Sequence, residues 1–362
     1  MPSRLRIIFA FLGAAVLLGS GLSACGTTLK TQQVSTTEMA AEVAKQREIA
    51  LLDQVELSRY MHTIAFDLLS NNVPLCGARV HHIPGMAFWT LENYEKQWRK
   101  PAKQAFGLTQ GIHIRRVADN GPAAQAGLQI GDSLIKVGSH EVAPGKDGLA
   151  ALQSYLEKNL TDAPLGVVYA REDTVKTTSL TPTQACDYQV VYSDKSDVNA
   201  FADGRRVVML RGIIEFVRND DELAMIIGHE LAHNILDHIS KKQTQMAGGM
   251  LGGLLLDVLA GTSGQFSRLG GQLGAQAFSP AYESEADYMG LYATARAGYN
   301  INKAPYLWRR MGARNTGSIA LTSTHPPTAE RFVALEKTVA EIQQKQTQAL
   351  PLVPDRKNPE PQ

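Results

Sequence analysis

Three stretches of the chain place apolar residues three and four positions apart, which is the spacing of one face of an α-helix. They cover residues 38–69, 220–235 and 328–344. Asn219 or Asp220 can cap the start of the middle helix, and acidic residues fill its first turn. We therefore predict a mainly helical domain. The apolar positions are Ile49, Leu52, Leu57, Tyr60, Met61, Ile64, Leu68, Leu223, Ile226, Ile227, Leu231, Ile235, Phe332, Leu335, Val339 and Ile342.

Residues 106–180 follow a different pattern and are expected to form a unit of their own. Residues 111–117 alternate between apolar and polar side chains, as a strand does. The string GPAAQAGLQIGDSLIKVG at 121–138 closely resembles PDZ domains, in which it supplies a short helix, a tight turn and a strand. By the same resemblance, residues 149–159 form a second helix and residues 165–171 a closing strand.

The resemblance to PDZ domains implies a peptide-binding edge. A peptide would add as a strand beside residues 111–117 and place its C-terminal carboxylate near the start of that strand. A PDZ fold that serves only as a spacer is the alternative. The residues implied in peptide binding are Phe106, Gly107, Leu108, Ile112 and Ile114.

The middle helix contains the run HELAH within the apolar sequence AMIIGHELAHNIL. Residues four apart lie roughly 40° apart around a helix, so His229 and His233 project from one face, where two imidazoles can share a zinc ion. Glu230 lies about 100° from His229, within reach of a water on that metal without being a ligand itself. A buried pair of core histidines is the alternative, but polar residues in an apolar helix are costly without a compensating role.

A zinc site of this type needs a third protein ligand, commonly a Glu from a following helix. The run YESEADYMG offers Glu283, and Asp287 lies four residues later on the same helical face. We predict that Glu283 binds the metal and that Asp287 orients a ligating imidazole. Glu285 is the rival ligand, but it faces away from Asp287.

The segments on either side of the HELAH helix have distinct patterns. Residues 206–212 are alternating and β-branched, which predicts a strand. In zinc peptidases a strand antiparallel to the substrate commonly precedes the metal-binding helix, and analogy gives residues 206–212 this role. Residues 246–274 are rich in Gly, Leu and Ala, so they could form a flap over the cleft, a surface that touches the bilayer, or buried helices, which we favour.

Composition excludes few functions but argues against nucleic acid as a partner. The 362 residues are 44% hydrophobic and 20% charged, with a formal net charge of +1. This is ordinary globular composition, and the length fits two domains or one domain with a large insertion. The near-neutral balance offers no basic surface for a polyanion.

The N-terminus has the pattern of a targeting segment. Arg4 and Arg6 form a short basic region, and residues 7–18 are apolar. The tetrapeptide LSAC that ends at Cys25 resembles a bacterial lipobox, in which the cysteine carries lipid. A transmembrane anchor is the alternative, but the apolar run is short for a span. Gly26 stands where an Asp would retain a lipoprotein at the inner membrane, so the sequence resembles an outer-membrane lipoprotein facing the periplasm.

Export changes the interpretation of the other cysteines. Cys76 and Cys186 remain as a pair in an oxidising compartment and flank the PDZ-like segment. We predict a disulfide that ties the two ends of this insertion together. Two buried thiols are the alternative.

Three separated motifs agree with one family. HELAHN, YESEADYMG and STHPPTAER, in that order, resemble metallopeptidase family forty-eight. Its members include the CAAX prenyl proteases, HtpX-type membrane proteases and periplasmic BepA-like proteases. The resemblance covers residues 38–75 and 187–344, with the PDZ-like unit inserted between them.

The family resemblance assigns roles to residues of this chain. It implies that His229, His233 and Glu283 bind one Zn²⁺ per chain, that Glu230 is the general base, and that Asp287 supports a ligand. It also implies a role for His325 near the metal, either in stabilising the developing oxyanion or in occupying zinc in a resting state. His238 matches a recurrent family histidine, although packing on the helix surface explains it equally well.

These observations predict a lipid-anchored zinc metalloendopeptidase of the bacterial cell envelope that cleaves misfolded or unassembled envelope proteins with help from its PDZ domain. A chaperone-like or PDZ-based assembly factor at the outer membrane is the main alternative, and a peptidase of cell-wall peptides ranks below it. The expected fold class is α+β, with a mainly helical zincin (gluzincin-type) protease domain and a small β-rich PDZ-like insertion. The predicted segments are a signal peptide (1–24), a tether (25–37), the first part of the protease domain (38–104), the PDZ-like domain (105–182), the remaining protease domain (183–345) and a disordered tail (346–362).

Overall fold

The structure is a computed structural model that describes residues 32–260, 265, 268, 278–314 and 329–357. Residues 1–46 and 47–362 form two compact units. The predicted signal peptide, Cys25, His325 and most of residues 261–274 lie outside the described residues.

The described part of the first unit is dominated by the beginning of helix α1 (Thr36–Asn71). Ser35 and Glu38 cap this helix reciprocally, because the Ser35 amide donates to Glu38 Oε2 at 2.8 Å and the Glu38 amide donates to Ser35 Oγ at 3.2 Å. The helix predicted for residues 38–69 is therefore present.

Within the second unit, α1 buries only part of the predicted apolar stripe. Met61, Ile64 and Leu68 are almost completely buried in the main core. Ile49 and Leu52 are 66% and 47% exposed, so the buried face does not extend to this part of the helix. The spacing predicts which residues share a face, but the neighbouring elements decide how far along the helix that face is covered.

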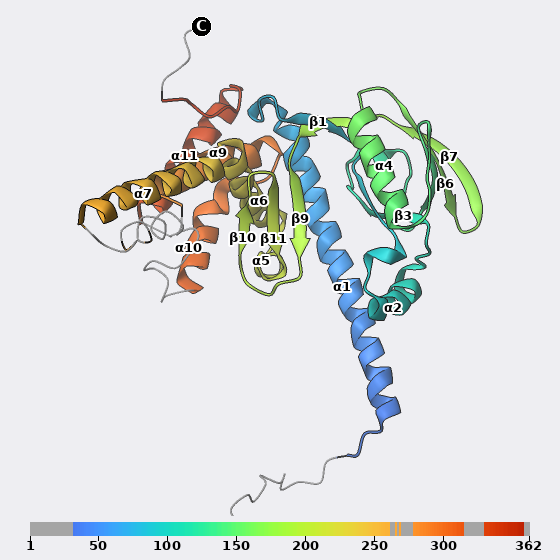
Figure 1. Cartoon of the computed structure of the whole chain (residues 1–362). Helices are drawn as coiled ribbons and strands as arrows, with labels where there is room; N and C mark the ends of the chain where they lie inside the picture. Colours follow the sequence, from blue (N-terminus) through green and yellow to red (C-terminus); the bar gives the residue numbers. More distant parts are fainter. Residues whose placement is uncertain (1–31, 261–264, 266–267, 269–277, 315–328, 358–362) are drawn as a thin grey trace, which may run out of the picture. The chain divides into compact units, whose positions relative to one another are not determined.

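The main core lies between three helices and a three-stranded sheet (Figure 1). The helices are α6 (Asp220–Ile235), α9 (Pro280–Arg296) and α11 (Ala329–Thr347). The central strand β11 (Arg206–Leu210) pairs parallel with β9 (Gln189–Ser193) and antiparallel with β10 (Ala200–Ala202). The remaining elements of this region are η1 (Val73–Leu75), α5 (Arg211–Phe216), α7 (His238–Ala260), η3 (Ile301–Lys303) and α10 (Ala304–Arg314).

Two glycines allow α6 and α9 to approach closely. A Cβ atom on Gly228 would lie 2.6 Å from Thr294 Oγ1, and one on Gly290 would lie 2.9 Å from the backbone of His229. Asn219 fixes the start of α6, because its side chain accepts a hydrogen bond from the Glu222 amide at 3.0 Å. The close approach brings the face of α6 that carries His229 against α9.

The PDZ-like region is a six-stranded antiparallel sheet in the order β2-β3-β4-β6-β7, with β5 paired to β4. Helix α4 (Gly145–Asn159) covers one face and buries Leu149, Leu152 and Leu156 in a core shared with the strands. The α+β fold class, with a β-rich PDZ-like unit beside helical segments, is therefore confirmed. The strands and short helices are β2 (Met86–Trp89), η2 (Leu91–Asn93), α2 (Lys96–Phe106), β3 (Ile112–Val117), α3 (Pro122–Gln125), β4 (Ser133–Val137), β5 (His140–Glu141), β6 (Leu165–Arg171) and β7 (Thr174–Leu180).

The PDZ-like sheet begins earlier than predicted. Strand β2 pairs with β3, with Met86 opposite Val117, so the sheet already includes residue 86. The boundary predicted at residue 105 was placed too late. Residues 80–98 mix short apolar runs without a clear period, so the sequence pattern alone did not reveal that a segment before α2 completes the sheet.

The two ends of the PDZ-like insertion meet in a narrow neck. Strands β1 (Val80–Ile83) and β8 (Thr183–Cys186) pair antiparallel, with Val80 opposite Cys186. Cys76 and Cys186 form a disulfide across this neck. The ladder and the disulfide together tie the two ends of the insertion to each other beside the main core, which includes Cys76 and Cys186.

The chain after α11 is ordered as far as residue 357, so the prediction of a disordered tail from residue 346 was wrong for this part. Arg296 donates to the Leu352 carbonyl at 3.1 Å, and Lys345 pairs with Asp355 at 2.7 Å. The Asp355 amide also donates to Tyr288 Oη. Prolines and polar residues predict disorder only when nothing folds over them, and here the segment runs back over α9 and α11.

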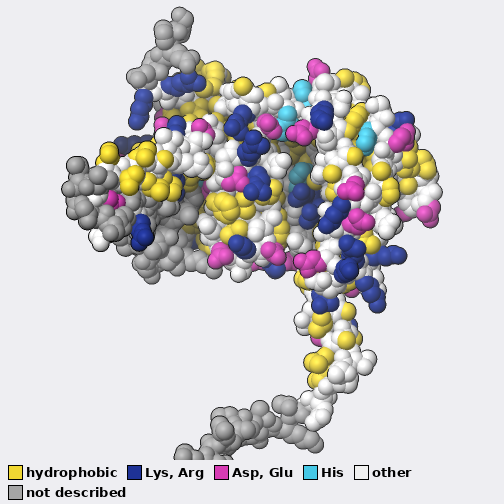
Figure 2. Space-filling model, viewed as in Figure 1, with side chains coloured by type: hydrophobic (Ala, Val, Ile, Leu, Met, Phe, Trp, Pro, Cys, Tyr) yellow, Lys and Arg dark blue, Asp and Glu magenta, His cyan; other side chains and the backbone are white. Residues whose placement is uncertain are grey.

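Helix α7 carries exposed apolar side chains, which form a yellow patch in Figure 2. Leu251, Leu254 and Leu255 are each more than half exposed. The described part of residues 246–274 is thus not the set of buried helices that we favoured. Among the described residues, no helix is both long and apolar enough to cross a membrane.

Candidate metal centre

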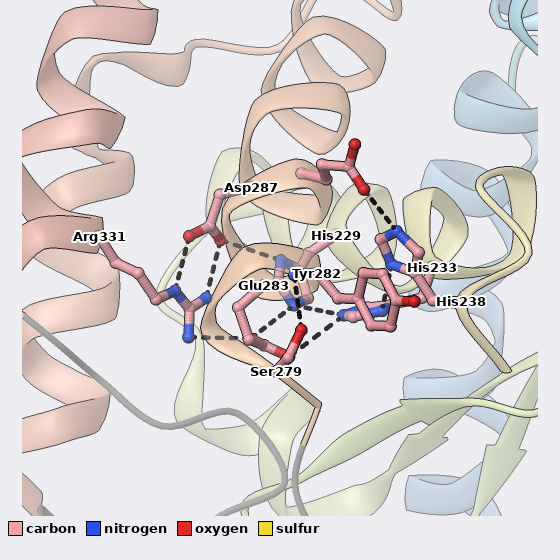
Figure 3. A network of polar contacts seen from close by, with 9 residues as sticks. His229, His233, His238, Ser279, Tyr282, Glu283, Asp287 and Arg331 are labelled. Atoms are coloured by element: carbon pink, nitrogen blue, oxygen red, sulfur yellow. Dashed lines mark hydrogen bonds and ion pairs between the residues drawn. The ribbon is translucent and has the colours of Figure 1, made fainter. Parts of the chain in front are cut away.

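The structure brings His229, His233 and Glu283 together in the buried space between α6 and α9 (Figure 3). The two Nε2 atoms of the histidines lie 3.2 Å apart. Glu283 places Oε2 at 3.6 Å from His229 Nε2 and Oε1 at 3.5 Å from His233 Nε2. These are the three residues that the sequence predicts as ligands, and all three side chains are almost completely buried.

The separations between these atoms test whether the site fits a metal ion. Zinc binds histidine nitrogen and carboxylate oxygen at about 2.0–2.2 Å in tetrahedral geometry, which places neighbouring ligand atoms roughly 3.3–3.5 Å apart. The observed separations of 3.2, 3.5 and 3.6 Å match this spacing. Two imidazole nitrogens and one carboxylate also form the donor set of catalytic zinc sites. The residues present therefore fit the metal.

Asp287 and Arg331 hold His229 from the side opposite the cluster. His229 Nδ1 lies 3.0 Å from Asp287 Oδ1, and Arg331 pairs with both oxygens of Asp287 at 2.7 and 2.8 Å. A carboxylate at Nδ1 keeps the proton there and leaves Nε2 free to bind a metal. Arg331 also reaches Glu283 Oε2 at 2.9 Å, so one guanidinium orients two groups of the cluster.

The pKa values of these groups are shifted in opposite directions by burial and by their partners. Burial raises the pKa of Asp287, but hydrogen bonds from His229 and Arg331 outweigh burial, and the net pKa lies below its usual value. Burial lowers the pKa of His229, against the raising influence of Asp287 and Glu283. The net shifts keep Asp287 ionised and the imidazole neutral, which is the form that binds metals.

His233 has a different kind of support. Its Nδ1 lies 3.0 Å from Nδ1 of His238, whose Nε2 lies 3.2 Å from Glu285 Oε2. A proton on His233 Nδ1 can be donated to His238, which in turn donates to Glu285, and His233 Nε2 is left as a lone pair facing the cluster. The rings of Phe278 and Tyr282 stack on His233 and His238, with centroids 4.1 and 4.5 Å apart.

This arrangement distinguishes the two candidate carboxylates of α9. Glu283 is completely buried beside the imidazoles, whereas the side chain of Glu285 is 51% exposed and contacts His238. Glu285 therefore lies outside the three-residue cluster. His238 itself is fully buried, so packing on the helix surface does not explain it.

Glu230 is buried on α6, next to His229 in the sequence, and is 2% exposed. The charges of Asp287, Glu283 and, to a smaller extent, Glu230 raise the pKa of Arg331 against the lowering effect of burial. The structure thus places a fourth acidic group beside the cluster.

The residues predicted for peptide binding in the PDZ-like region are not arranged as expected. Strand β3 is paired on both sides, with β2 and with β4, so no peptide can add beside it. Ile112 and Ile114 are completely buried in the core, and Leu108 is buried against Trp89 in a separate cluster. Phe106 ends α2, and Gly107 caps that helix. The prediction of this edge was wrong because β2, which covers it, lies before the recognisable PDZ pattern.

The role given by analogy to residues 206–212 also changes. Strand β11 has β9 on one side and β10 on the other, so it cannot pair with a substrate. Among the described strands of this sheet, β10 has a partner on one side only. A sequence pattern identifies a strand but not its neighbours, because pairing depends on segments that lie elsewhere in the chain.

Sequence reasoning did not single out Arg331 or Trp308. Arg331 lies inside the motif STHPPTAER, but its partners are 44 and 48 positions away, and no local pattern links them. The ring of Trp308 lies 5.0 Å from that of His229 and 5.7 Å from the Arg331 guanidinium carbon, so it covers both groups.

Comparison with known proteins agrees with the two parts of this chain. Residues 171–339 match Peptidase family M48, and residues 113–165 match the PDZ domain. The first of these ranges contains His229, Glu230, His233, Glu283 and Asp287.

Relatives come from both eukaryotes and bacteria. The mitochondrial metalloendopeptidase OMA1 of Schizosaccharomyces pombe is 32% identical over 152 residues, which cover 41% of this chain and 45% of that protein. The beta-barrel assembly-enhancing protease of Yersinia pestis is 29% identical over 132 residues, which cover 33% of this chain and 27% of that protein.

A relative that is matched over most of its own length is the metalloprotease LoiP of Escherichia coli, which is 25% identical over 235 residues, or 61% of this chain and 87% of LoiP. The chain spans just under half the length of the OMA1 proteins of fission yeast, Arabidopsis thaliana and Saccharomyces cerevisiae. The matched ranges and the buried His-His-Glu cluster agree with each other: residues 171–339, which hold the cluster, are similar to Peptidase family M48, and residues 113–165, on their N-terminal side, are similar to the PDZ domain.

Proposed function

We propose that the protein is a zinc-dependent metalloendopeptidase of the bacterial cell envelope. The observation that carries the proposal is the buried cluster of His229, His233 and Glu283, with Glu230 beside it on the same helix. A protein that only binds other proteins has no need of a metal-ligand set combined with an adjacent acid. The names of the relatives, which include several metalloendopeptidases, support the same assignment.

His229, His233 and Glu283 would hold one zinc ion per chain. When bound, zinc supplies Lewis acidity, which makes a water acidic enough to lose its proton near neutral pH and polarises the carbonyl group of a peptide. The chain supplies neutral imidazoles for this purpose, each with a partner at Nδ1: Asp287 for His229 and His238 for His233.

Glu230 would move the protons of the reaction. Its carboxylate accepts a proton from the attacking water and later gives that proton to the nitrogen of the leaving amine. Because Glu230 is buried, bulk water does not compete for the proton. His325, which lies outside the described residues, is proposed either to stabilise the negative charge on the carbonyl oxygen or to occupy the metal in a resting state.

The substrate would be an extended polypeptide that pairs with β10. This strand has an unpaired side among the described strands of its sheet, and it contacts α6, which carries the cluster. Extended segments are available in misfolded or unassembled proteins, which supports such proteins as the substrate class. The PDZ domain would add a second contact with the same polypeptide.

The location in the envelope rests on the sequence and on the relatives. The LSAC tetrapeptide supports a lipid on Cys25, and the disulfide between Cys76 and Cys186 supports an oxidising compartment. The Yersinia pestis relative is named for β-barrel assembly, which supports a periplasmic position at the outer membrane.

The test is cleavage of a denatured protein by the chain from residue 26 onward, with bound zinc measured in the same samples. Glu230→Gln should lower kcat by roughly 10²–10⁴-fold while zinc content is unchanged, because the base is lost and the ligands remain. Glu336→Gln, an exposed acid that pairs with Arg309, is the matched control and should cleave normally.

Two results would contradict the proposal. Absence of zinc from the wild-type protein would remove the proposed cofactor. Equal cleavage by the wild type and Glu230→Gln would show that Glu230 is not the base. Zinc without cleavage in either protein would direct attention to His325, and His325→Ala should then release activity if this residue occupies the metal.

A further inference from the structure

Two consecutive arginines lie at a β-bulge of β3, where Arg116 contacts helix α1 and Arg115 lies over Trp89. Ala87 of β2 pairs with Arg116 and Phe88 pairs with Ile114, so Arg115 is an extra residue in the ladder. Consecutive residues of a regular strand point to opposite faces, and a bulge changes this by re-aiming one side chain. Arg116 donates to Ser58 of α1 at 2.6 Å, and the guanidinium carbon of Arg115 lies 5.5 Å from the centroid of Trp89.

We call this region the arginine seam and define it by the residues that meet there. Trp89 packs with Leu51 and Val55 of α1, and Ser58 and His62 continue the same helical face toward Arg116. Tyr94 lies beside Trp89, with ring centroids 6.1 Å apart. The arginine seam consists of Ser58, His62, Trp89, Tyr94, Arg115 and Arg116.

The charges of the arginine seam have no counter-charge. Among the described residues, neither Arg115 nor Arg116 forms an ion pair. Arg310 and Arg331, whose side chains are 13% and 5% exposed, have carboxylate partners in Glu222 at 2.6 Å and Asp287 at 2.7 Å. Charges that are withdrawn from water are ordinarily paired, and the half-buried Arg115 and Arg116 depart from this pattern.

The two guanidiniums influence each other's ionisation. Burial and, to a smaller extent, the neighbouring charge of Arg115 together lower the pKa of Arg116 to about 10. Burial and the charge of Arg116 lower the pKa of His62 to about 3, so this imidazole is neutral and adds no third positive charge. The Ser58 hydroxyl and the face of Trp89 contact the two cations, but no carboxylate among the described residues pairs with them.

Several donors of the seam also lack partners. Four donor atoms are shielded from solvent and make no hydrogen bond with any described residue. They are Nε of Arg115, Nε of Arg116, Nε1 of Trp89 and Oη of Tyr94. Trp89 is 1% exposed, so water from the bulk does not reach its indole nitrogen. Most buried donors in proteins have a partner, and a group of unpartnered donors beside two cations is the arrangement expected around an absent anion.

We propose that the arginine seam binds a carboxylate of a polypeptide, with the guanidiniums of Arg115 and Arg116 as the charged contacts. A guanidinium presents parallel N–H donors that match the two oxygens of a carboxylate. That the ligand is a polypeptide rests on the proposed function, since a protease meets polypeptides. The carboxylate belongs either to a chain terminus or to an acidic side chain, and both have the same chemistry.

The test measures binding separately from cleavage. The full-length chain with Glu230→Gln is mixed with a labelled ten-residue peptide, and fluorescence anisotropy reports binding. Three forms of the peptide are compared: a free C-terminus without acidic side chains, an amidated C-terminus, and an amidated C-terminus with one internal Asp. Inorganic phosphate is titrated as a separate anion.

The free C-terminus should bind, and the amidated peptide without Asp should bind at least about tenfold more weakly, because a charge-assisted hydrogen bond is lost. Arg115→Gln and Arg116→Gln should each weaken the binding by a similar factor. Arg59→Gln is the matched control, since Arg59 is a nearby arginine that already pairs with Glu56 and Asp119. Its substitution removes the same charge and should leave binding unchanged. Recovery of binding by the internal Asp would identify acidic side chains as ligands too.

Four results would overturn the proposal. The first two are equal binding of the free and amidated peptides, and unchanged binding of the free peptide by both Arg115→Gln and Arg116→Gln. The other two are absence of binding by every peptide, and binding of phosphate alone. A second measurement guards against a variant that folds poorly. The free-carboxylate peptide should raise the unfolding temperature of the parent but not that of Arg115→Gln, each compared with its own unliganded baseline. Because Glu230 is absent throughout, failure of the proteolytic function does not produce failure here.

Discussion

At the metal centre, the buried cation Arg331 is surrounded by carboxylates: it contacts both oxygens of Asp287 and one oxygen of Glu283. At the arginine seam, Arg115 and Arg116 have no carboxylate among the described residues. Arg331 is almost completely buried and Arg115 and Arg116 are half-buried, but among the described residues only Arg331 has carboxylate partners. The difference teaches that the metal centre balances its buried cation with its own acids, whereas the described part of the chain supplies no such acid to the seam.

The comparison is tested most strongly by Arg331→Met. Removing one partner of a buried ion pair leaves Asp287 and Glu283 uncompensated, so the free energy of unfolding should fall by about 3–5 kcal/mol. Urea denaturation of the metal-free protein measures this change. A decrease below about 1 kcal/mol would show that the carboxylates do not depend on Arg331.

Metal removal should produce the next largest effect. A ligand that binds only the folded state stabilises it by about 2.7 kcal/mol when its free concentration is a hundred times its Kd. Extraction of zinc by a chelator should therefore lower the unfolding temperature, and added zinc should restore it. His233→Ala serves as the control, because this variant should show no response to zinc.

His238→Phe should weaken zinc binding without removing a ligand. The partner of a metal-binding histidine typically contributes 10–100-fold to metal affinity, and Phe keeps the ring that stacks on Tyr282. Competition with a zinc chelator measures the affinity. Glu285→Gln should have a smaller effect, because its side chain is half exposed. Unchanged affinity in His238→Phe would mean that His233 needs no partner at Nδ1.

Acid should weaken the metal-free protein partly through Asp287. The pKa of Asp287 is lower in the folded protein than in the unfolded chain, so its stabilisation is complete above the unfolded pKa, near 4, and is lost as the pH falls through the folded pKa. The free energy of unfolding of the wild type should fall below pH 4 by up to about 1.4 kcal/mol per pH unit more steeply than that of Asp287→Asn. Parallel curves for the two proteins would contradict this prediction.

Arg115→Met should produce the smallest change. No carboxylate is left unpaired when this guanidinium is removed, and the Met side chain can still pack on Trp89, so stability should change by less than about 1 kcal/mol in either direction. The same urea denaturation measures it. If the free energy of unfolding fell as much as in Arg331→Met, the contrast between the two regions would be contradicted, because Arg115 would then already have a compensating partner.

The metal centre could be predicted to a large extent because its geometry is mostly local. His229 and His233 lie on one turn of a helix, and Glu283 and Asp287 on one turn of another, so each pair is positioned by the helical period alone. The Asn219 cap is local too. The sequence did not predict that these two helices pack against each other. Gly228 and Gly290 allow this close packing because neither has a side chain at the contact. The partner of His233 Nδ1 was harder to predict from the sequence, because His238 lies beyond the end of α6.

The β regions were harder to predict, for the opposite reason. A strand can be recognised from alternation, but its partners come from anywhere in the chain. Strand β2 lies before the recognisable PDZ pattern and covers the edge that the pattern assigned to a peptide. The role expected of residues 206–212 changed in the same way, because β10 occupies the side of β11 that a substrate would need.

By itself the sequence determined the α+β fold class, the helices that carry the site and the residues that face one another within each helical turn, since these follow from spacing along one segment. Only the tertiary structure decided which strands have open edges, that residues 348–357 fold back over the core, and that Arg116 contacts α1 beside a bulge at Arg115. These features depend on contacts between segments distant in the sequence, and a local pattern carries no information about such contacts. The charges of the arginine seam show this most clearly, because they became unusual only when the structure showed that no carboxylate in the described part of the chain pairs with them.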